Sequence, residues 1–413
     1  MRPRRRPILA SGEAKRRKHH PDYWLLVISI ILMMIGLIVV YAISPGLSVQ
    51  KHVTENYYVS KQLIAIGLGV VAFIVVSNMS IQTWRHIERP LIITAGIASL
   101  AVRVVGERVN GAYRWIQVGG ISFQAAELIK FALLIWIAGF LSDRIRTGEI
   151  NDYQKSFKPL IIALVLVAIV VGKVQSDLGS TGVIVAIMGT MIYVAGLPLK
   201  KLAVIAGVVG VAVVVLVLGS GYRRERLNTY LNPSKDCLTT GYQACQALIS
   251  VGSGGMFGLG LGRSVQAYGY LPEAANDSIF AIFAEKFGFV GTTVLIALFV
   301  AFFSRLKKII EHSTDTYSRF LVTGILAWLS TQTIINIGAM IGLLPLKGIT
   351  LPFISSGGTS IIFVSAAIGI AFQVSRYTTY GLITNNDSEG NRNDDSFSRR
   401  RLRGAYHPNS GSR

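Results

Sequence analysis

Two carboxylates four residues apart, Glu273 and Asp277, stand where a long polar stretch runs into a strongly apolar segment. A carboxylate at such a point is one of two things. It can cap the helix that follows, by accepting hydrogen bonds from the first backbone N–H groups. It can also be a general base that removes a proton from an attacking hydroxyl. The spacing alone leaves both interpretations of Asp277 open.

The other candidate residues also adjoin apolar segments. Glu127 and Lys130 lie at i and i+3, so they share one helix face and can pair. Such a pair could lock helix packing, form the charged wall of a cavity, or do both. Asp177 lies between two apolar segments and is expected to cap the second one. Arg114 beside Trp115 could anchor the chain at the lipid headgroups or bind phosphate.

Two glycine-rich stretches, 252–262 and 345–360, predict tight, flexible backbone. The first resembles a phosphate-binding loop, but it lacks the Gly-Lys-Ser/Thr ending and follows no predicted strand. The sequence also has no cluster of His and Cys metal ligands, no Ser-His-Asp arrangement and no nucleotide motif. These absences exclude an ATP-driven enzyme of the cytoplasm.

The elements that position these groups are predicted to be membrane helices. The 413 residues are 51% hydrophobic and 15% charged, whereas soluble domains carry about 25% charged residues. Continuous apolar runs of roughly 17–25 residues recur, which favours helices over a barrel. We therefore predict an all-α polytopic membrane protein of about ten transmembrane helices, at 23–43, 58–78, 90–105, 123–142, 158–173, 180–196, 199–220, 276–304, 319–342 and 355–375.

Ten spans place both termini on one side of the membrane, and about two thirds of the Lys and Arg residues fall on that side. The excess predicts that a basic tail, 1–22, and a disordered tail, 380–413, are both cytoplasmic. The transmembrane domain between them, 23–379, then carries a large extracytoplasmic loop between spans seven and eight, about 221–275. Asp277 is therefore expected at the outer surface.

The net charge of +20 fits basic loops and contacts with anionic lipid, so no nucleic-acid partner is predicted. Carboxylates and cations on the outer side, beside a lipid-exposed body, suit a substrate with an anionic head and an apolar tail. Cys237 and Cys245 both lie in the large loop, where a disulfide is permitted, but two cysteines leave the pairing open.

Six segments resemble those of the SEDS family (shape, elongation, division and sporulation), in the family's order: NGAYRWI, FQAAELIK, QSDLGS, VGSGGMFGLGLGRS, LPEAANDSIFAIFAEKFG and PLKGITLPFISSGGTS. They belong to a body of about 23–380, and 260–274 and 346–352 look like division-type rather than elongation-type members. The resemblance implies an inverting peptidoglycan glycosyltransferase of the bacterial cell membrane, at the division septum. Such enzymes polymerise lipid II, a disaccharide-pentapeptide on undecaprenyl pyrophosphate, at the outer leaflet. Their partners are a class B penicillin-binding protein and other division proteins.

In the family pattern the catalytic carboxylate falls on Asp277. A sugar hydroxyl needs a base, whereas a pyrophosphate leaving group needs no acid, unlike in glycosidases. Glu273 is the fallback base if the helix extends back that far. Arg114, Lys130 and either Arg223 or Lys347 are expected to stabilise the departing charge, and a divalent cation, Mg²⁺ or Mn²⁺, could share that role.

No metal site of the chain itself is predicted. The candidate substrate-binding residues are Arg114, Trp115, Gln124, Glu127, Lys130, Asp177, Glu273, Lys347, Ser355 and Gly357. Three rival functions stay open: a flippase for the lipid-linked precursor, an elongation-type polymerase and a division scaffold without chemistry. A flippase needs a polar path through the midplane, whereas these charges cluster on the outer side.

Overall fold

The computed structural model describes residues 20–109, 112–118, 121–219, 221, 224, 230, 237–239 and 241–378. The predicted tails, 1–22 and 380–413, lie outside these residues except for 20–22. Arg223, one of the cations expected at the site, also lies outside them.

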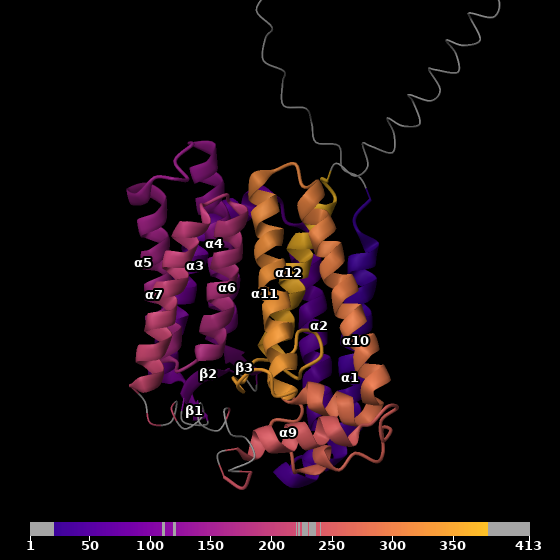
Figure 1. Ribbon diagram of the computed structural model, residues 1–413. Coiled ribbons are helices and arrows are strands. Elements are labelled where there is room, and N and C mark those ends of the chain that lie inside the picture. The colour runs from indigo at the N-terminus through magenta and orange to yellow at the C-terminus, as the bar shows by residue number, and fades with distance from the viewer. Residues whose placement is uncertain are drawn as a thin grey trace, which may run out of the picture.

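Long helices stand side by side and form the body of the protein (Figure 1). Within the described residues, seven helices are long and apolar enough to cross a membrane. The mostly helical, polytopic fold is therefore confirmed, and the count of ten spans stays a prediction. The helices of the bundle are α1 (Tyr23–Lys51), α2 (Tyr57–Asn78), α3 (Ile81–Val105), α4 (Ala125–Arg146), α5 (Lys158–Val167) with its π-helical continuation η2 (Ala168–Val174), α6 (Leu178–Val194), α7 (Leu199–Leu218), α10 (Ile279–His312), α11 (Thr316–Met340) and α12 (Gly358–Ser375).

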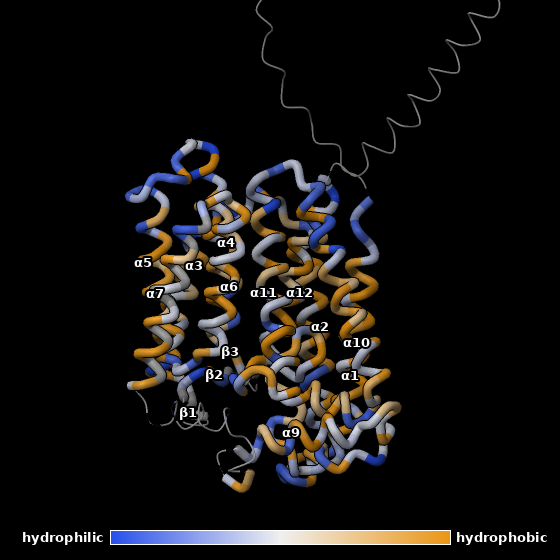
Figure 2. The backbone as a smooth tube through the Cα atoms, in the orientation of Figure 1, coloured by the Kyte–Doolittle hydropathy of each residue, from blue (hydrophilic) through white to orange (hydrophobic). Residues whose placement is uncertain are grey.

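Hydropathy changes along the bundle axis. Hydrophobic residues dominate the helix shafts, and hydrophilic residues gather in the connections at the ends (Figure 2). Asp22 caps α1 by accepting a hydrogen bond from Leu25 N, and its carboxylate forms an ion pair with Arg305 at 2.6 Å. The backbone N–H of Asp22 donates to Ser375 Oγ. The start of α1 and the end of α12 are thus fastened at one end of the bundle, called here the termini end.

The opposite end, called here the outer end, carries a small sheet that the all-α prediction missed. β1 (Glu107–Val109), β2 (Ala112–Val118) and β3 (Ile121–Gln124) pair antiparallel in the order β1-β2-β3. The sequence AYRWIQV of β2 is rich in aromatic and β-branched residues, which fit a pleated surface. β3 runs directly into α4. The sheet therefore holds Arg114 and Trp115 in fixed register beside the start of α4.

The described part of the segment between α7 and α10 also lies at the outer end, where Figure 1 labels α9. This part includes α9 (Tyr242–Ser253) and the 3₁₀-helix η4 (Gln266–Tyr268). Cys237 and Cys245 form a disulfide with a Cα–Cα distance of 5.6 Å, which answers the question that the sequence left open. The bond ties the first turn of α9 to the turn before it.

The glycine-rich run 252–262 packs against a kink in α10. Gly288 adopts φ 66° inside that helix, and Phe289 N donates to Gly255 O. A side chain at Gly254 or Gly258 would collide with the backbone of α10. The glycines therefore allow a close backbone approach, as the predicted tight backbone requires.

Candidate active site

A cavity of about 430 Å³ opens at the outer end of the bundle. Its walls come from α2, β2, β3, the turn at 272–278, the segment at 345–358 and the first turns of α12. Because these elements are far apart in sequence, the cavity exists only in the assembled bundle. The lining residues are Tyr57, Tyr58, Lys61, Ile64, Ala65, Leu68, Arg114, Trp115, Gln117, Ser122, Gln124, Glu273, Asn276, Asp277, Gly348, Thr350, Ser356, Gly357, Gly358 and Ile362.

Asp277 lies in the turn before α10 and faces the cavity. The N-cap position of α10 is Ser278, whose side chain makes no capping hydrogen bond, so Asp277 lies one residue before the N-cap. The backbone carbonyl of Asp277 accepts a 2.7 Å hydrogen bond from Asn336 Nδ2 of α11, and Ile349 O accepts another from the same nitrogen. Asn336 is 2% exposed. A buried amide therefore fixes the Asp277 backbone against the segment at 345–358.

The turn at 272–278 is braced a second time by Ser355. Its hydroxyl donates to Asn276 O at 2.6 Å and accepts from Leu351 N at 2.7 Å. Ser356 N also donates to Ala275 O. Ser355 is buried and lies outside the cavity lining, so it supports the turn instead of facing a ligand.

Arg114 approaches Asp277 from the sheet. A Cβ placed on Gly348 would lie 3.5 Å from Asp277 Oδ2 and 3.8 Å from Arg114 Nη1. The carboxylate and the guanidinium therefore converge on this glycine, whose φ of 63° also disfavours a side chain. Arg114 Nη2 donates to Ser176 O at 2.8 Å, and Nε makes no hydrogen bond to any described residue. The guanidinium is anchored at one nitrogen and keeps donors for an anion.

Asp177 follows this anchor and caps α6, as predicted. Its carboxylate accepts from Ser180 N at 3.0 Å and from Ser180 Oγ at 2.8 Å, and the residue is 3% exposed. Asp177 does not line the cavity. Its contribution is to hold the turn whose Ser176 carbonyl orients Arg114.

Glu127 and Lys130 form the predicted ion pair, at 2.7 Å, but they lie behind the cavity wall. Lys130 Nζ also donates to Gln332 Oε1 at 3.2 Å. Gln332 Nε2 in turn donates to the carbonyl and the hydroxyl of Thr350, both at 3.0 Å. Thr350 lines the cavity. The pair is buried and reaches the cavity through Gln332 and Thr350, so its direct contact with substrate stays a prediction.

Glu273 lines the cavity, but its role as a base one helical turn before Asp277 rested on a helix that is not there. Residues 272–278 form a turn, and Glu273 is exposed with φ 52°. Its carboxylate accepts from Asn276 Nδ2 at 2.6 Å. Lys347 lines a separate, much smaller cavity that Asp277 also borders.

Among the predicted residues, the cavity brings together Asp277, Arg114, Trp115, Gln124, Glu273 and Gly357, and it leaves out Glu127, Lys130, Asp177, Lys347 and Ser355. The α2 wall was missed because the start of α2 was taken as part of an apolar span. The available signal was the cluster Tyr57, Tyr58 and Lys61 at the head of that span.

The sequence left room for a divalent cation, Mg²⁺ or Mn²⁺, that shares the stabilisation of the departing charge. Within the described residues, no group of three or more His, Cys, Asp or Glu could hold a metal by itself. Mg²⁺ commonly binds through one or two carboxylates together with substrate phosphates. Glu273 and Asp277 offer carboxylates to the cavity, so the donor set fits a cation shared with a phosphate ligand.

The bundle and its outer cavity define a polytopic membrane protein with a polar site at one membrane face. Residues 23–380 match the profile of the FtsW/RodA/SpoVE family, described as cell cycle protein. The chain belongs to this family, which confirms the SEDS resemblance. It is 38% identical over 367 residues to stage V sporulation protein E of Bacillus subtilis (strain 168), covering 88% of this chain and 99% of that protein. It is 36% identical over 364 residues to the probable peptidoglycan glycosyltransferase FtsW of Coxiella burnetii, covering 86% and 96%.

Solved structures agree with the fold. A chain from a study of polymerization and crosslinking by a peptidoglycan synthase complex aligns with a TM-score of 0.71 at 25% identity, covering 86% of this chain and 98% of that one. The rod shape determining protein RodA of Thermus thermophilus aligns with a TM-score of 0.63 at 24% identity, covering 87% and 98%.

Proposed function

We propose that this protein is a peptidoglycan glycosyltransferase that polymerises lipid II at the outer leaflet of the bacterial cell membrane. The observation that carries the proposal is the convergence of the Asp277 carboxylate and the Arg114 guanidinium in one outer cavity. Family membership and relatives named as probable peptidoglycan glycosyltransferases support it. The disulfide in the loop beside the cavity suits a compartment outside the cytoplasm.

The chemistry is an inverting displacement at the anomeric carbon of the donor sugar. Asp277 accepts the proton of the acceptor hydroxyl as that oxygen bonds to the anomeric carbon. The bond from this carbon to the diphosphate oxygen breaks, and the diphosphate leaves with the electron pair. Because diphosphate is a weak base, no acid is needed, and Arg114 stabilises the developing charge. A divalent cation held by Glu273 and the phosphates would add further charge compensation.

We assign the protein to septal synthesis, working with a class B penicillin-binding protein and other division proteins. The division-type sequences at 260–274 and 346–352 support this assignment, as do several relatives named FtsW. The structural neighbour from a complex that couples polymerization and crosslinking supports a transpeptidase partner.

The test is polymerisation of purified lipid II by the chain reconstituted with its transpeptidase partner. Asp277→Asn keeps the shape of the side chain but cannot accept the proton, so we expect the rate to fall by about 10²–10⁴-fold. Glu273→Gln removes the other cavity carboxylate, the fallback base, and leaves Asp277 in place, so we expect a smaller loss of rate than in Asp277→Asn.

Full activity of Asp277→Asn together with an inactive Glu273→Gln would transfer the base to Glu273. Transport of lipid II across the bilayer by the wild type, with no polymer formed, would overturn the proposal in favour of a flippase.

A further inference from the structure

One face of α2 forms a wall of the cavity that changes from polar to apolar along the helix. Its lining residues are spaced by three and four, as one helix face requires: Tyr57, Tyr58, Lys61, Ile64, Ala65 and Leu68. The first three are aromatic or cationic, and the last three are apolar. With a rise of about 1.5 Å per residue, this face spans roughly 16 Å along the helix. The polar part lies at the outer end, because α2 begins there and ends at the termini end (Figure 1).

The apolar part of this wall is open to the exterior. Ile64 is 55% exposed and Leu68 is 39% exposed, although both also line the cavity. Ile362 of α12 lines the same cavity, one helical turn further from the outer end than Gly358. The part of the cavity furthest from the outer end is therefore apolar. It opens along α2, on a surface that would lie in the bilayer.

Lys61 stands at the boundary between the two parts. Its side chain is exposed, and Nζ lies 4.4 Å from the centroid of the Tyr57 ring. No carboxylate in the described part of the chain lies within ion-pair distance of Lys61. Lys61 can therefore offer its ammonium to an anionic ligand in the cavity.

We infer that Lys61 binds the diphosphate of an isoprenyl-diphosphate substrate, and that the stripe of Ile64, Ala65 and Leu68 with Ile362 holds the start of its isoprenyl chain. In such a lipid the diphosphate joins a polar sugar to an apolar chain. It must therefore lie where the cavity changes from polar to apolar, and on α2 that point is Lys61. Since Arg114 lies beside Asp277, the two cations contact different ends of the diphosphate: Arg114 the oxygen that leaves the reacting carbon, and Lys61 the phosphate that carries the lipid. This inference names the lipid contact of the proposed glycosyltransferase and rests on that function.

Direct binding of undecaprenyl diphosphate to the full chain in nanodiscs tests the inference without requiring turnover. A charge-assisted hydrogen bond contributes enough that Lys61→Gln should weaken binding by about 10–100-fold. Lys61→Arg keeps the charge and should restore most of it. Lys51→Gln removes a cation at the same end of the bundle that does not line the cavity, and it should bind like the wild type.

The apolar stripe is tested by chain length. The wild type should bind undecaprenyl diphosphate more tightly than farnesyl diphosphate, and Leu68→Ser should narrow that difference. In polymerisation assays, Lys61→Gln should raise KM for lipid II more than it lowers kcat, because binding rather than the reacting bond is affected.

Unchanged undecaprenyl diphosphate binding by Lys61→Gln would overturn the inference, even if polymerisation fell. Equal losses with Lys51→Gln would also overturn it, because the effect would then be one of general charge. If the wild type bound the lipid through Lys61 but formed no polymer, the proposed function would fail while the binding site stood.

Discussion

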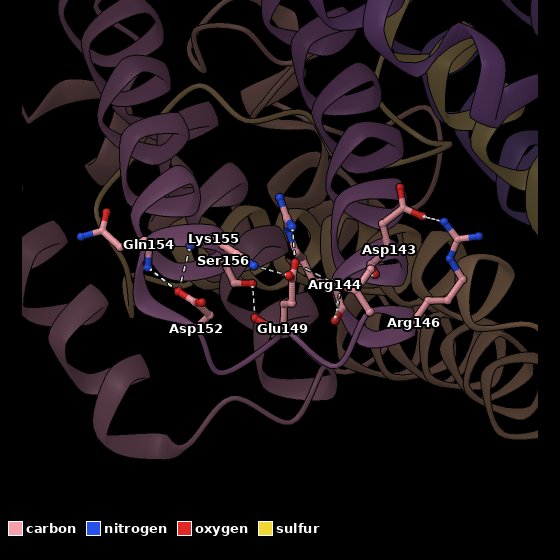
Figure 3. A network of polar contacts seen from close by, with 9 residues as sticks. Asp143, Arg144, Arg146, Glu149, Asp152, Gln154, Lys155 and Ser156 are labelled. Atoms are coloured by element: carbon pink, nitrogen blue, oxygen red, sulfur yellow. Dashed lines mark hydrogen bonds and ion pairs between the residues drawn. The ribbon is translucent and has the colours of Figure 1, made fainter.

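The polar networks at the two ends of the bundle are built in opposite ways. At the outer end, the side chains of Lys130 and Glu127 are 2% and 3% exposed, and their bonds continue through α11 to the cavity wall. At the termini end, charged side chains gather between the end of α4 and the π-helical turn η1 (Tyr153–Phe157), as Figure 3 shows. There the side chains of Arg144 and Glu149 are 30% and 27% exposed.

The difference indicates that the outer network holds side chains in fixed positions more strongly than the exposed network does. Breaking a buried ion pair leaves an uncompensated charge and is strongly destabilising, whereas exposed pairs contribute little because water and salt screen them. The outer network is also long-range, since it joins α4, α11 and the segment at 345–358. The network between α4 and η1 is largely local to 143–156, whereas the long-range pair at the termini end, Asp22–Arg305, lies apart from it. Substitutions at the outer end should therefore have larger effects on both stability and chemistry.

The largest effect is expected from Glu127→Gln. The substitution leaves the Lys130 ammonium buried and uncompensated, which costs about 3–5 kcal/mol of folding stability. Thermal unfolding in detergent, followed by tryptophan fluorescence, measures this loss, because Lys130 Nζ lies 5.3 Å from the centroid of the Trp328 ring.

The double variant Glu127→Gln/Lys130→Met should recover part of the loss, since no lone charge remains. A single variant that melts like the wild type would contradict the importance given to the buried pair.

A smaller effect, directed at the chemistry, is expected from Asn336→Leu. Asp277 O and Ile349 O would both lose the hydrogen bond from Asn336 Nδ2, and an unpaired buried carbonyl costs about 1–3 kcal/mol. Because the turn that carries Asp277 loosens, kcat of lipid II polymerisation should fall by more than KM rises.

The matched control is Asn78→Leu at the termini end. Its amide donates to Ile74 O on an exposed helix surface, so water replaces the lost bond. If the two variants lowered kcat equally, the hydrogen bonds from Asn336 would not be what positions Asp277.

The sequence predicted the parts of this site that are coded locally. The Glu127–Lys130 pair and the cap at Asp177 follow from spacings of three residues on one helix. Long apolar runs likewise predicted the helices, because a membrane span is a local requirement.

Features that need a distant partner were missed. Gln332 joins the Glu127–Lys130 pair to Thr350 from a helix some 200 positions further along, and no local pattern indicates it. The turn at 272–278 is held by Asn336 and Ser355, so the helix does not extend back to Glu273, as the fallback base would require. The cavity wall on α2 was not predicted for the same reason, because Lys61 and the sheet residues line one cavity only in the folded bundle.

The smallest effect is expected from Glu149→Gln at the termini end. Hydrogen bonds from Lys155, and then from Arg144, hold the pKa of Glu149 below its usual range. A carboxylate with a lowered folded pKa stabilises the fold above its unfolded pKa of about 4.3, and the contribution disappears as pH falls through the folded value. At pH 7 the contribution is thus fully present but screened by solvent, so the melting midpoint should shift little and lipid II polymerisation should not change. The small difference from the wild type should shrink with added salt and vanish as the pH is lowered past the folded pKa. A loss of polymerisation comparable to that of Asn336→Leu would show that this exposed network also controls the outer site, and the contrast between the two ends would fail.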